Sequence, residues 1–158
     1  MKVSVGLIAY NHEPYIEQAV QGVLAQKTNF DYEIVIGEDC STDNTRSILV
    51  RVQEQHPDKI RLLLNEKNQG MIQNYIQTLH ACQGEYIALL DGDDYWCRED
   101  KLQKQVDFLD QNPDYAVCFH SVLKVYEDGS REPKVVRPKD QRTSFDLKDL
   151  LASMFIPT

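Results

Sequence analysis

Short apolar segments alternate with amphipathic segments four times in the first two-thirds of the chain. The apolar segments are rich in Val, Ile and Leu, as expected for strands covered on both faces. They span residues 3–9, 32–39, 59–65 and 86–91. This alternation predicts an α/β fold, in which a mostly parallel sheet carries helices on both faces.

The amphipathic segments predict four helices, one after each strand. Pro14 suits the first turn of the first helix, and "STDNT" offers an N-cap to the second. The third begins at Gly70, and the fourth spans roughly residues 99–111. Apolar spacing predicts their buried faces: Ile16, Ala19, Val20, Val23 and Leu24; Ile48, Leu49 and Val52; Ile72, Ile76 and Leu79; Leu102, Val106 and Leu109.

The pattern changes beyond Pro113. Residues 115–126 predict a longer strand, residues 131–143 an exposed loop or edge strand, and residues 144–155 a short helix capped by Ser144. Because the chain stops just after this amphipathic segment, we expect a larger protein to continue past Thr158.

The charge of the chain narrows the classes of partner. A formal net charge of −8 disfavours nucleic acid or an anionic membrane surface as the main partner. An acidic protein that binds an anionic ligand also needs a cation between the two.

Cysteine usage and the N-terminus bear on the compartment. The four cysteines form no C-x-x-C pair, which favours reduced thiols over zinc or disulfides. The N-terminal apolar run is too short for a signal peptide or a membrane span. We therefore expect a cytoplasmic protein, with peripheral association at the inner face of the membrane through a partner or a missing segment.

Polar residues, several of them acidic, follow each of the four predicted strands. They read "AYNHE", "GEDCSTD", "NEKNQG" and "DGDD". Ligands of open parallel sheets bind outside the carboxyl ends of the strands, so these segments predict the binding site. The G-x-G-x-x-G and P-loop fingerprints are absent, which disfavours nicotinamide and P-loop chemistry.

Three carboxylates crowd the end of the fourth strand. Gly92 separates Asp91 from Asp93 and leaves the turn free to bring both towards one point. Hard cations such as Mg²⁺ or Mn²⁺ take carboxylate, phosphate and water oxygens, so a metal here would offset the repulsion. The alternative is a polar turn in which an aspartate caps the following helix.

The chain closely resembles the family-2 glycosyltransferases in four stretches that occur in the family's order. They are "VSVGLIAYNHEPYIEQAVQGVLAQ", "YEIVIGEDCSTDNT", "LNEKNQGMIQN" and "GEYIALLDGDDYW". The resemblance covers about residues 2–112. It implies the A-type nucleotide-diphospho-sugar transferase fold and an inverting sugar transferase that depends on Mn²⁺ or Mg²⁺. Residues 1–158 would then form one donor-binding domain, with a nucleotide-binding core at 1–112 and the incomplete start of an acceptor-side segment at 113–158.

The resemblance also implies roles for the ends of the first two strands. The segment that packs against the nucleotide base would comprise Ala9, Tyr10, Asn11 and Glu13. Tyr10 would stack on the base or, alternatively, cap the sheet. Asp39 would accept the N3–H of uracil, which favours uridine over cytidine, whereas Asp43 is expected to cap the second helix.

The end of the third strand matches the family only in part. Asn68 and Gly70 correspond to an N-x-G element near the base and ribose, and Asn74 completes the implied nucleotide contacts. Many relatives carry an arginine just before this asparagine, placed to meet the diphosphate. Gln73 stands there in this chain, so one positive contact is lost.

The acidic turn matches the D-x-D motif of the family. The resemblance implies that Asp93 is the more direct metal ligand, that Asp91 lies near the ribose or holds metal-bound water, and that Gly92 contacts the nucleotide. Asp94 would orient the loop. Trp96 would either wall the sugar site or belong to the core.

The larger departure from the family pattern concerns the general base. Nothing after Pro113 matches the carboxylate motif that supplies this base in the family. We expect that base beyond Thr158, and His120 is better interpreted as a structural residue. The predicted function is inverting transfer of a sugar from a UDP-sugar to a hydroxyl of a glycan, lipid-linked or protein acceptor. The alternative is a non-catalytic nucleotide-sugar-binding or partner-binding module. A sugar nucleotidylyltransferase is disfavoured, since "AYNHEPY" is neither Gly-rich nor basic.

Overall fold

The computed structural model describes residues 1–136, 144–146 and 148–149. The chain forms two compact units, Met1–Asp107 and Phe108–Thr158. The helix predicted at residues 144–155 lies mostly outside the described residues. No helix in the described ranges is long and apolar enough to span a bilayer.

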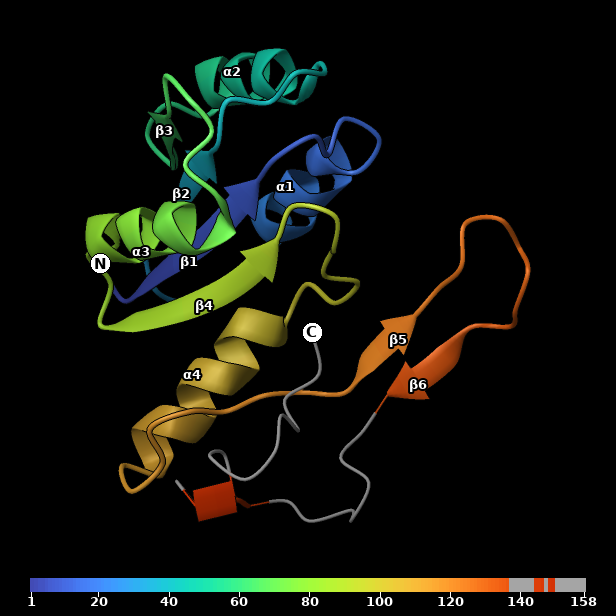
Figure 1. The fold of residues 1–158 in the computed structure, drawn as a ribbon. Coiled ribbons are helices and arrows are strands. Elements are labelled where there is room, and N and C mark those ends of the chain that lie inside the picture. The colour runs from blue at the N-terminus through green and yellow to red at the C-terminus, as the bar shows by residue number, and fades with distance from the viewer. Residues whose placement is uncertain (137–143, 147, 150–158) are drawn as a thin grey trace. The chain divides into compact units, whose positions relative to one another are not determined.

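Strands and helices alternate through the first unit, as predicted (Figure 1). The strands are β1 (Val3–Ala9), β2 (Tyr32–Glu38), β3 (Ile60–Leu64) and β4 (Tyr86–Asp91). The helices are α1 (Ile16–Leu24), α2 (Thr45–Gln55), α3 (Met71–Ala81) and α4 (Lys101–Gln111), of which α4 continues past Asp107.

The four strands form one parallel sheet in the order β3-β2-β1-β4. Val3 pairs with Tyr32 on one side and with Tyr86 on the other, so β1 is an interior strand. Because every strand runs the same way, all four carboxyl ends lie at one edge of the sheet.

One face of the sheet carries the apolar core. Val5 and Leu7 of β1 and Ile34 and Ile36 of β2 are fully buried there. Buried apolar residues of α1, α2 and α4 complete this cluster, which confirms most of the predicted helix faces. Each buried side chain of this size stabilises the fold by about 1.5–3 kcal/mol relative to exposure.

The opposite face carries α3, and there the predicted buried side is wrong. Ile72 and Ile76 are 71% and 42% exposed, whereas Asn74 and Thr78 are buried. The reason is close packing on Gly37, where a Cβ atom would lie 2.1 Å from the Thr78 hydroxyl oxygen. The Asn74 amide donates a hydrogen bond to the Gly37 carbonyl at 2.9 Å, so polar side chains fill this interface.

The second unit contains a short antiparallel hairpin. It pairs β5 (Val122–Lys124) with β6 (Lys134–Val136). The strand predicted at residues 115–126 is therefore wrong in length, since β6 offers a partner to only three residues. The edge strand allowed within residues 131–143 is present as β6. His120 Nδ1 lies 2.9 Å from the Ser121 carbonyl oxygen, a local contact on an exposed side chain.

Candidate functional site

The loops after β1 and β2 are bonded to each other at the carboxyl edge of the sheet. The Asn11 side-chain oxygen accepts a hydrogen bond from the Thr42 N–H at 2.8 Å, and the Asn11 N–H donates to Ser41 Oγ at 3.0 Å. The Glu13 carboxylate accepts from the Asn44 amide at 2.7 Å and from its N–H at 3.1 Å. The side chains of Asn11 and Glu13 thus brace the site, and their predicted contacts with nucleotide stay a prediction.

This braced pair of loops contains two residues in left-handed conformations. Asn11 has φ 56° and Cys40 has φ 60°. Such residues cost of order 1–3 kcal/mol each and cluster at functional sites. Ala9 is buried, and its carbonyl accepts the Asp39 N–H at 3.0 Å. Tyr10 is 41% exposed, so its ring is open to a ligand.

Asp39 contacts the loop that follows β3 (residues 65–70) and is only 2% exposed. Its Oδ1 atom accepts from the Asn65 amide and from the Gln69 N–H, both at 2.9 Å. Its Oδ2 atom accepts from the Gly70 N–H, also at 2.9 Å. A carboxylate has about four acceptor positions, so one position on Oδ2 is free for a further donor.

The two asparagines predicted to contact nucleotide hold the same loop. Asn68 Oδ1 accepts the Gly70 N–H at 3.0 Å, and Gly70 has φ 85°. Asn74 is 2% exposed and bridges the Gly37 carbonyl and the Asn65 amide. Its amide is thus used internally, and its nucleotide contact stays a prediction.

A buried ion pair below these loops was missed by sequence reasoning. Glu38 is fully buried, forms an ion pair with Arg46 and accepts the Ser41 N–H at 2.6 Å. Arg46 also donates to the Asn65 carbonyl at 2.5 Å. This bond connects the start of α2 to the loop after β3. An acid at the end of an otherwise apolar strand was the available signal.

The acidic turn after β4 is anchored to β1. The Gly92 N–H donates to the Ile8 carbonyl at 3.0 Å, and the Asp94 N–H donates to the Asp91 carbonyl at 3.1 Å. Burial and then the charge of Asp93 raise the pKa of Asp91, which His12 partly offsets. Burial and the charges of Asp93 and Asp91 likewise raise the pKa of Asp94.

Crowded carboxylates with raised pKa values fit a divalent cation, which would offset both repulsion and burial. Among the described residues, no three His, Cys, Asp or Glu side chains are grouped to hold a metal ion. A cation at this turn would therefore take its remaining oxygens from phosphate and water, as Mg²⁺ and Mn²⁺ commonly do.

Two further residues lie next to the turn and were not singled out from the sequence. A Cβ atom on Gly92 would lie 2.6 Å from His12 Nδ1, so the imidazole packs against the glycine. The pKa of Tyr75 is raised by burial and by the charge of Asp91, which places this side chain near the carboxylate. His12 stands within "AYNHE", where a polar residue after a strand end was the available signal.

Trp96 and Asp43 have structural roles that the sequence analysis named for them. Trp96 belongs to the core, and Lys101 Nζ lies 3.9 Å from the centre of its ring. Asp43 accepts the N–H of Thr45, the first residue of α2, at 2.9 Å. Burial opposes ionisation of Asp43, but hydrogen bonds from Thr45 and Glu13 outweigh it and lower the pKa.

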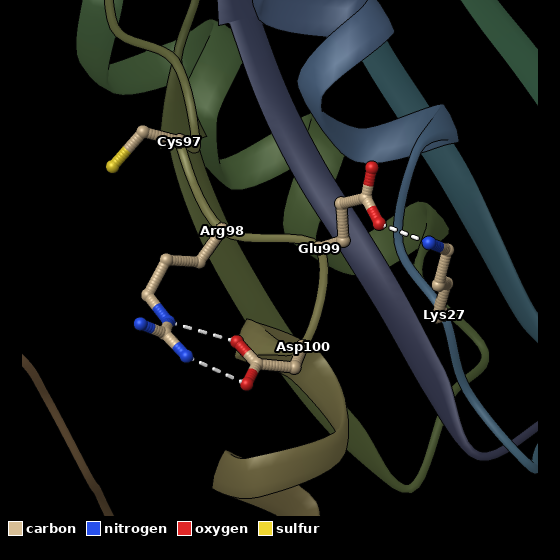
Figure 2. A pocket seen from close by; sticks show the side chains of 5 residues that line it. All are labelled: Lys27, Cys97, Arg98, Glu99 and Asp100. Carbon is tan, nitrogen blue, oxygen red and sulfur yellow. Dashed lines mark hydrogen bonds and ion pairs between the residues drawn. The ribbon is translucent and has the colours of Figure 1, made fainter.

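A hollow in the described part of the chain lies elsewhere, after the acidic turn. It measures about 410 Å³ and is lined by Lys27, Cys97, Arg98, Glu99 and Asp100 (Figure 2). Lys27 pairs with Glu99 and Arg98 with Asp100, so its charges satisfy one another. It is open and exposed, and we assign the site to the four strand-end loops instead.

Comparison with known proteins identifies the family. The model of Glycosyl transferase family 2 matches residues 4–157. The chain belongs to glycosyl transferase family 2. An uncharacterised protein of Mycobacterium tuberculosis is 41% identical over 99% of this family-2 chain and 45% of its own length. A dTDP-rhamnosyl transferase of Shigella flexneri is 32% identical over 89% of the chain and 48% of its own length. The chain thus spans about half the length of these relatives.

Solved structures agree with the fold of the family-2 chain. The mannosyltransferase PcManGT from Pyrobaculum calidifontis, in complex with GDP-Man and Mn²⁺, has a TM-score of 0.62 and 28% identity. That likeness covers 68% of this chain and 32% of PcManGT. S. aureus TarS in complex with UDP-GlcNAc also has a TM-score of 0.62, with 26% identity over 88% of this chain and 38% of TarS. The predicted A-type glycosyltransferase fold is confirmed.

Proposed function

We propose that this chain is the donor-binding part of an inverting glycosyltransferase that takes a UDP-sugar and a divalent cation. The observation that carries the proposal is the shared edge of the sheet. There, Asp39 keeps one open acceptor position, and the Asp91–Gly92–Asp93 turn gathers carboxylates. A base, a ribose and a diphosphate need contacts of these kinds side by side.

Asp39 is the proposed contact for the base. Its open Oδ2 position accepts a donor such as the N3–H of uracil, whereas cytosine presents an acceptor at N3. The three internal bonds hold the carboxylate in place before the ligand arrives, which lowers the entropic cost of binding. Tyr10, whose side chain is exposed, is the proposed stacking partner of the base.

Asp93 and Asp91 are the proposed ligands of Mn²⁺ or Mg²⁺. When bound, the metal would supply Lewis-acid stabilisation of the leaving diphosphate. Asp93 would be the more direct ligand, and Asp91 would lie near the ribose or hold the metal's waters. Asp94, bonded through its backbone to Asp91, keeps the turn closed.

Similar proteins support a nucleotide-sugar donor without choosing the nucleotide. PcManGT was solved with GDP-Man and TarS with UDP-GlcNAc, and the Shigella relative is named for dTDP-rhamnose. A carboxylate acceptor suits uracil, thymine and guanine alike, so Asp39 disfavours cytidine without choosing among the other three. Uridine is our proposal because Asp39 matches the aspartate that typically bonds uracil in the family that this chain resembles.

The acceptor side completes the proposal. A general base outside residues 1–158 removes the proton of an acceptor hydroxyl, which then attacks the anomeric carbon and inverts it. The acceptor is a glycan, a lipid-linked glycan or a protein. We propose a cytoplasmic location, with membrane association only through further segments.

Calorimetric titration of UDP into the chain, with and without Mn²⁺, tests this function. GDP, dTDP and CDP are titrated in the same way for comparison. We expect binding of UDP that strengthens with Mn²⁺, loss of that gain in Asp93→Asn, and weaker binding of CDP. Failure of every nucleoside diphosphate to bind would refute a donor site. Tighter binding of GDP or dTDP would keep the site and replace the nucleotide.

A further inference from the structure

One polar atom beside the acidic turn has no partner. His12 Nδ1 is buried and accepts or donates no hydrogen bond, one of two such side-chain atoms in the part of the chain that the structure describes. The other is Arg61 Nε, on a residue whose Nη2 donates to the Ala81 carbonyl at the end of α3 and to the Glu33 carboxylate in β2. A buried nitrogen without a partner costs stability, so its position calls for an explanation.

The backbone of His12 is fixed from three directions. Its N–H donates to Thr45 Oγ1 at 2.8 Å, and its carbonyl accepts the N–H groups of Tyr15 and Ile16, both at 2.9 Å. The preceding Asn11 is held in its left-handed conformation by the second loop. The backbone from which the imidazole projects is therefore held by bonds to α1, α2 and the braced loops.

The imidazole is aimed at the acidic turn. Gly92 lies between the His12 ring and the Ile8 carbonyl, since a Cβ atom there would be 2.6 Å from Nδ1 and 2.9 Å from that oxygen. Any side chain at position 92 would push the turn off β1.

We propose that His12 is a positioning residue for the donor site: its ring packs against Gly92, and its unpaired Nδ1 is free to bond a carboxylate of the Asp91–Gly92–Asp93 turn when cation and diphosphate bind. This inference rests on the function proposed above. His12 acts through the carboxylates and is not itself a metal ligand. The role gives a reason for the unpaired nitrogen, since a functional role is one explanation for a buried polar group left unsatisfied in a folded protein.

Three variants at position 12 distinguish the contribution of Nδ1 from that of the ring. His12→Ala removes both, His12→Phe keeps a ring without a nitrogen, and His12→Asn keeps a polar atom near the Nδ1 position. His80→Ala is the matched control, because His80 is exposed in the last turn of α3, at the end away from Gly70. For each protein, UDP affinity is measured by calorimetry with saturating Mn²⁺ and with EDTA, and the thermal midpoint is recorded.

The readout is the gain in UDP affinity that Mn²⁺ provides. We expect His12→Ala and His12→Phe to reduce that gain by about 10- to 100-fold, the usual effect of losing a group that orients metal ligands. His12→Asn should restore most of it, and His80→Ala should match the unmodified chain. UDP affinity in EDTA should change less than about threefold, which a general folding defect would not spare.

Three results would overturn the inference while leaving the proposed function intact. The first is that Mn²⁺ raises the UDP affinity of His12→Ala as much as that of the unmodified chain. The second is the same full gain in His12→Phe. The third is that His12→Ala loses UDP affinity equally with and without Mn²⁺. If His12→Ala fails to fold, the contrast between His12→Asn and His12→Phe decides. If the unmodified chain shows no gain from Mn²⁺, the proposed metal site fails, and the inference fails with it.

Discussion

Asn11 shows how one side chain can hold both a strained backbone and a neighbouring loop. Its φ of 56° is unfavourable for most residues, although asparagine tolerates it better than others. Its carboxamide oxygen accepts from both the N–H and the hydroxyl of Thr42. The strain is therefore offset by bonds that only a side chain of this length makes.

Two substitutions at this position separate strain from bonding. Asn11→Gly loses the bonds to Thr42 but relieves the backbone, and we expect it to cost about 1 kcal/mol of unfolding free energy. Asn11→Ala loses the bonds and keeps the strain, so it should cost about 1 kcal/mol more. Urea denaturation of the two variants measures the difference, and equal midpoints would show that the left-handed conformation carries no strain.

The pH dependence of stability follows from Asp91. Burial and Asp93 raise its pKa in the folded state, so the folded protein holds this proton more tightly than the unfolded chain. Its contribution to stability is complete below the unfolded pKa of about 3.9 and is lost as the pH rises through the folded pKa. At pH 7 without metal, ionised Asp91 therefore destabilises the fold.

Asp91→Asn should then stabilise the metal-free chain at pH 7 by up to about 1 kcal/mol, because it removes the charge and keeps the shape. The advantage should vanish near pH 3.5, where the aspartate is protonated in both states. Thermal midpoints of both proteins in EDTA across this range provide the test. A variant that is less stable at pH 7 would mean that the Asp91 carboxylate makes a stabilising contact when ionised.

At the scale of elements, the packing of α3 depends on one glycine. Gly37→Ala places a Cβ atom 2.1 Å from the Thr78 hydroxyl and 2.5 Å from the Asn74 amide oxygen. Both side chains are buried and hydrogen-bonded, so neither can yield freely. We expect a loss of about 2–3 kcal/mol in denaturant unfolding, in the range of core overpacking.

Gly6→Ala is the matched control on the same face. Its nearest neighbour would be Cys82 Sγ at 3.6 Å, which is ordinary contact, so stability should change by less than about 0.5 kcal/mol. If both variants lost stability equally, the loss would reflect glycine removal from a strand rather than the fit of α3.

The elements that the sequence predicted well are those governed by burial. β1, β2, β3 and β4 are short runs of mostly apolar residues, and the acidic edge follows from their shared direction. The face of α3 was misjudged because spacing identifies apolar residues and cannot show that Gly37 admits Asn74 and Thr78 instead. The hydrogen-bond partners of the Asn11 and Glu13 side chains could not be predicted either, because both side chains bond to residues about 30 positions away.

At the scale of the whole molecule, the site should respond as one unit to its ligands. We expect Mn²⁺ and UDP together to slow amide hydrogen exchange in residues 10–13, 39–44, 65–70 and 91–94. Asp93→Asn should lose the metal-dependent part of this protection, and β5 and β6 should not change. Exchange measured by mass spectrometry gives the map. Protection centred on residues 97–100, the hollow of Figure 2, would move the site there.

The position of β1 inside the sheet has a consequence for synthesis. β1 is the first strand made, yet its partner β4 follows β2 by about 50 residues. At 5–20 residues per second the ribosome needs roughly 3–10 s to add them, and one edge of an apolar strand stays unpaired meanwhile. Open strand edges recruit other chains. The strand that closes this edge also ends in the acidic turn, so a nascent chain interrupted before Asp91 lacks the carboxylates that we propose as metal ligands and is also exposed to aggregation.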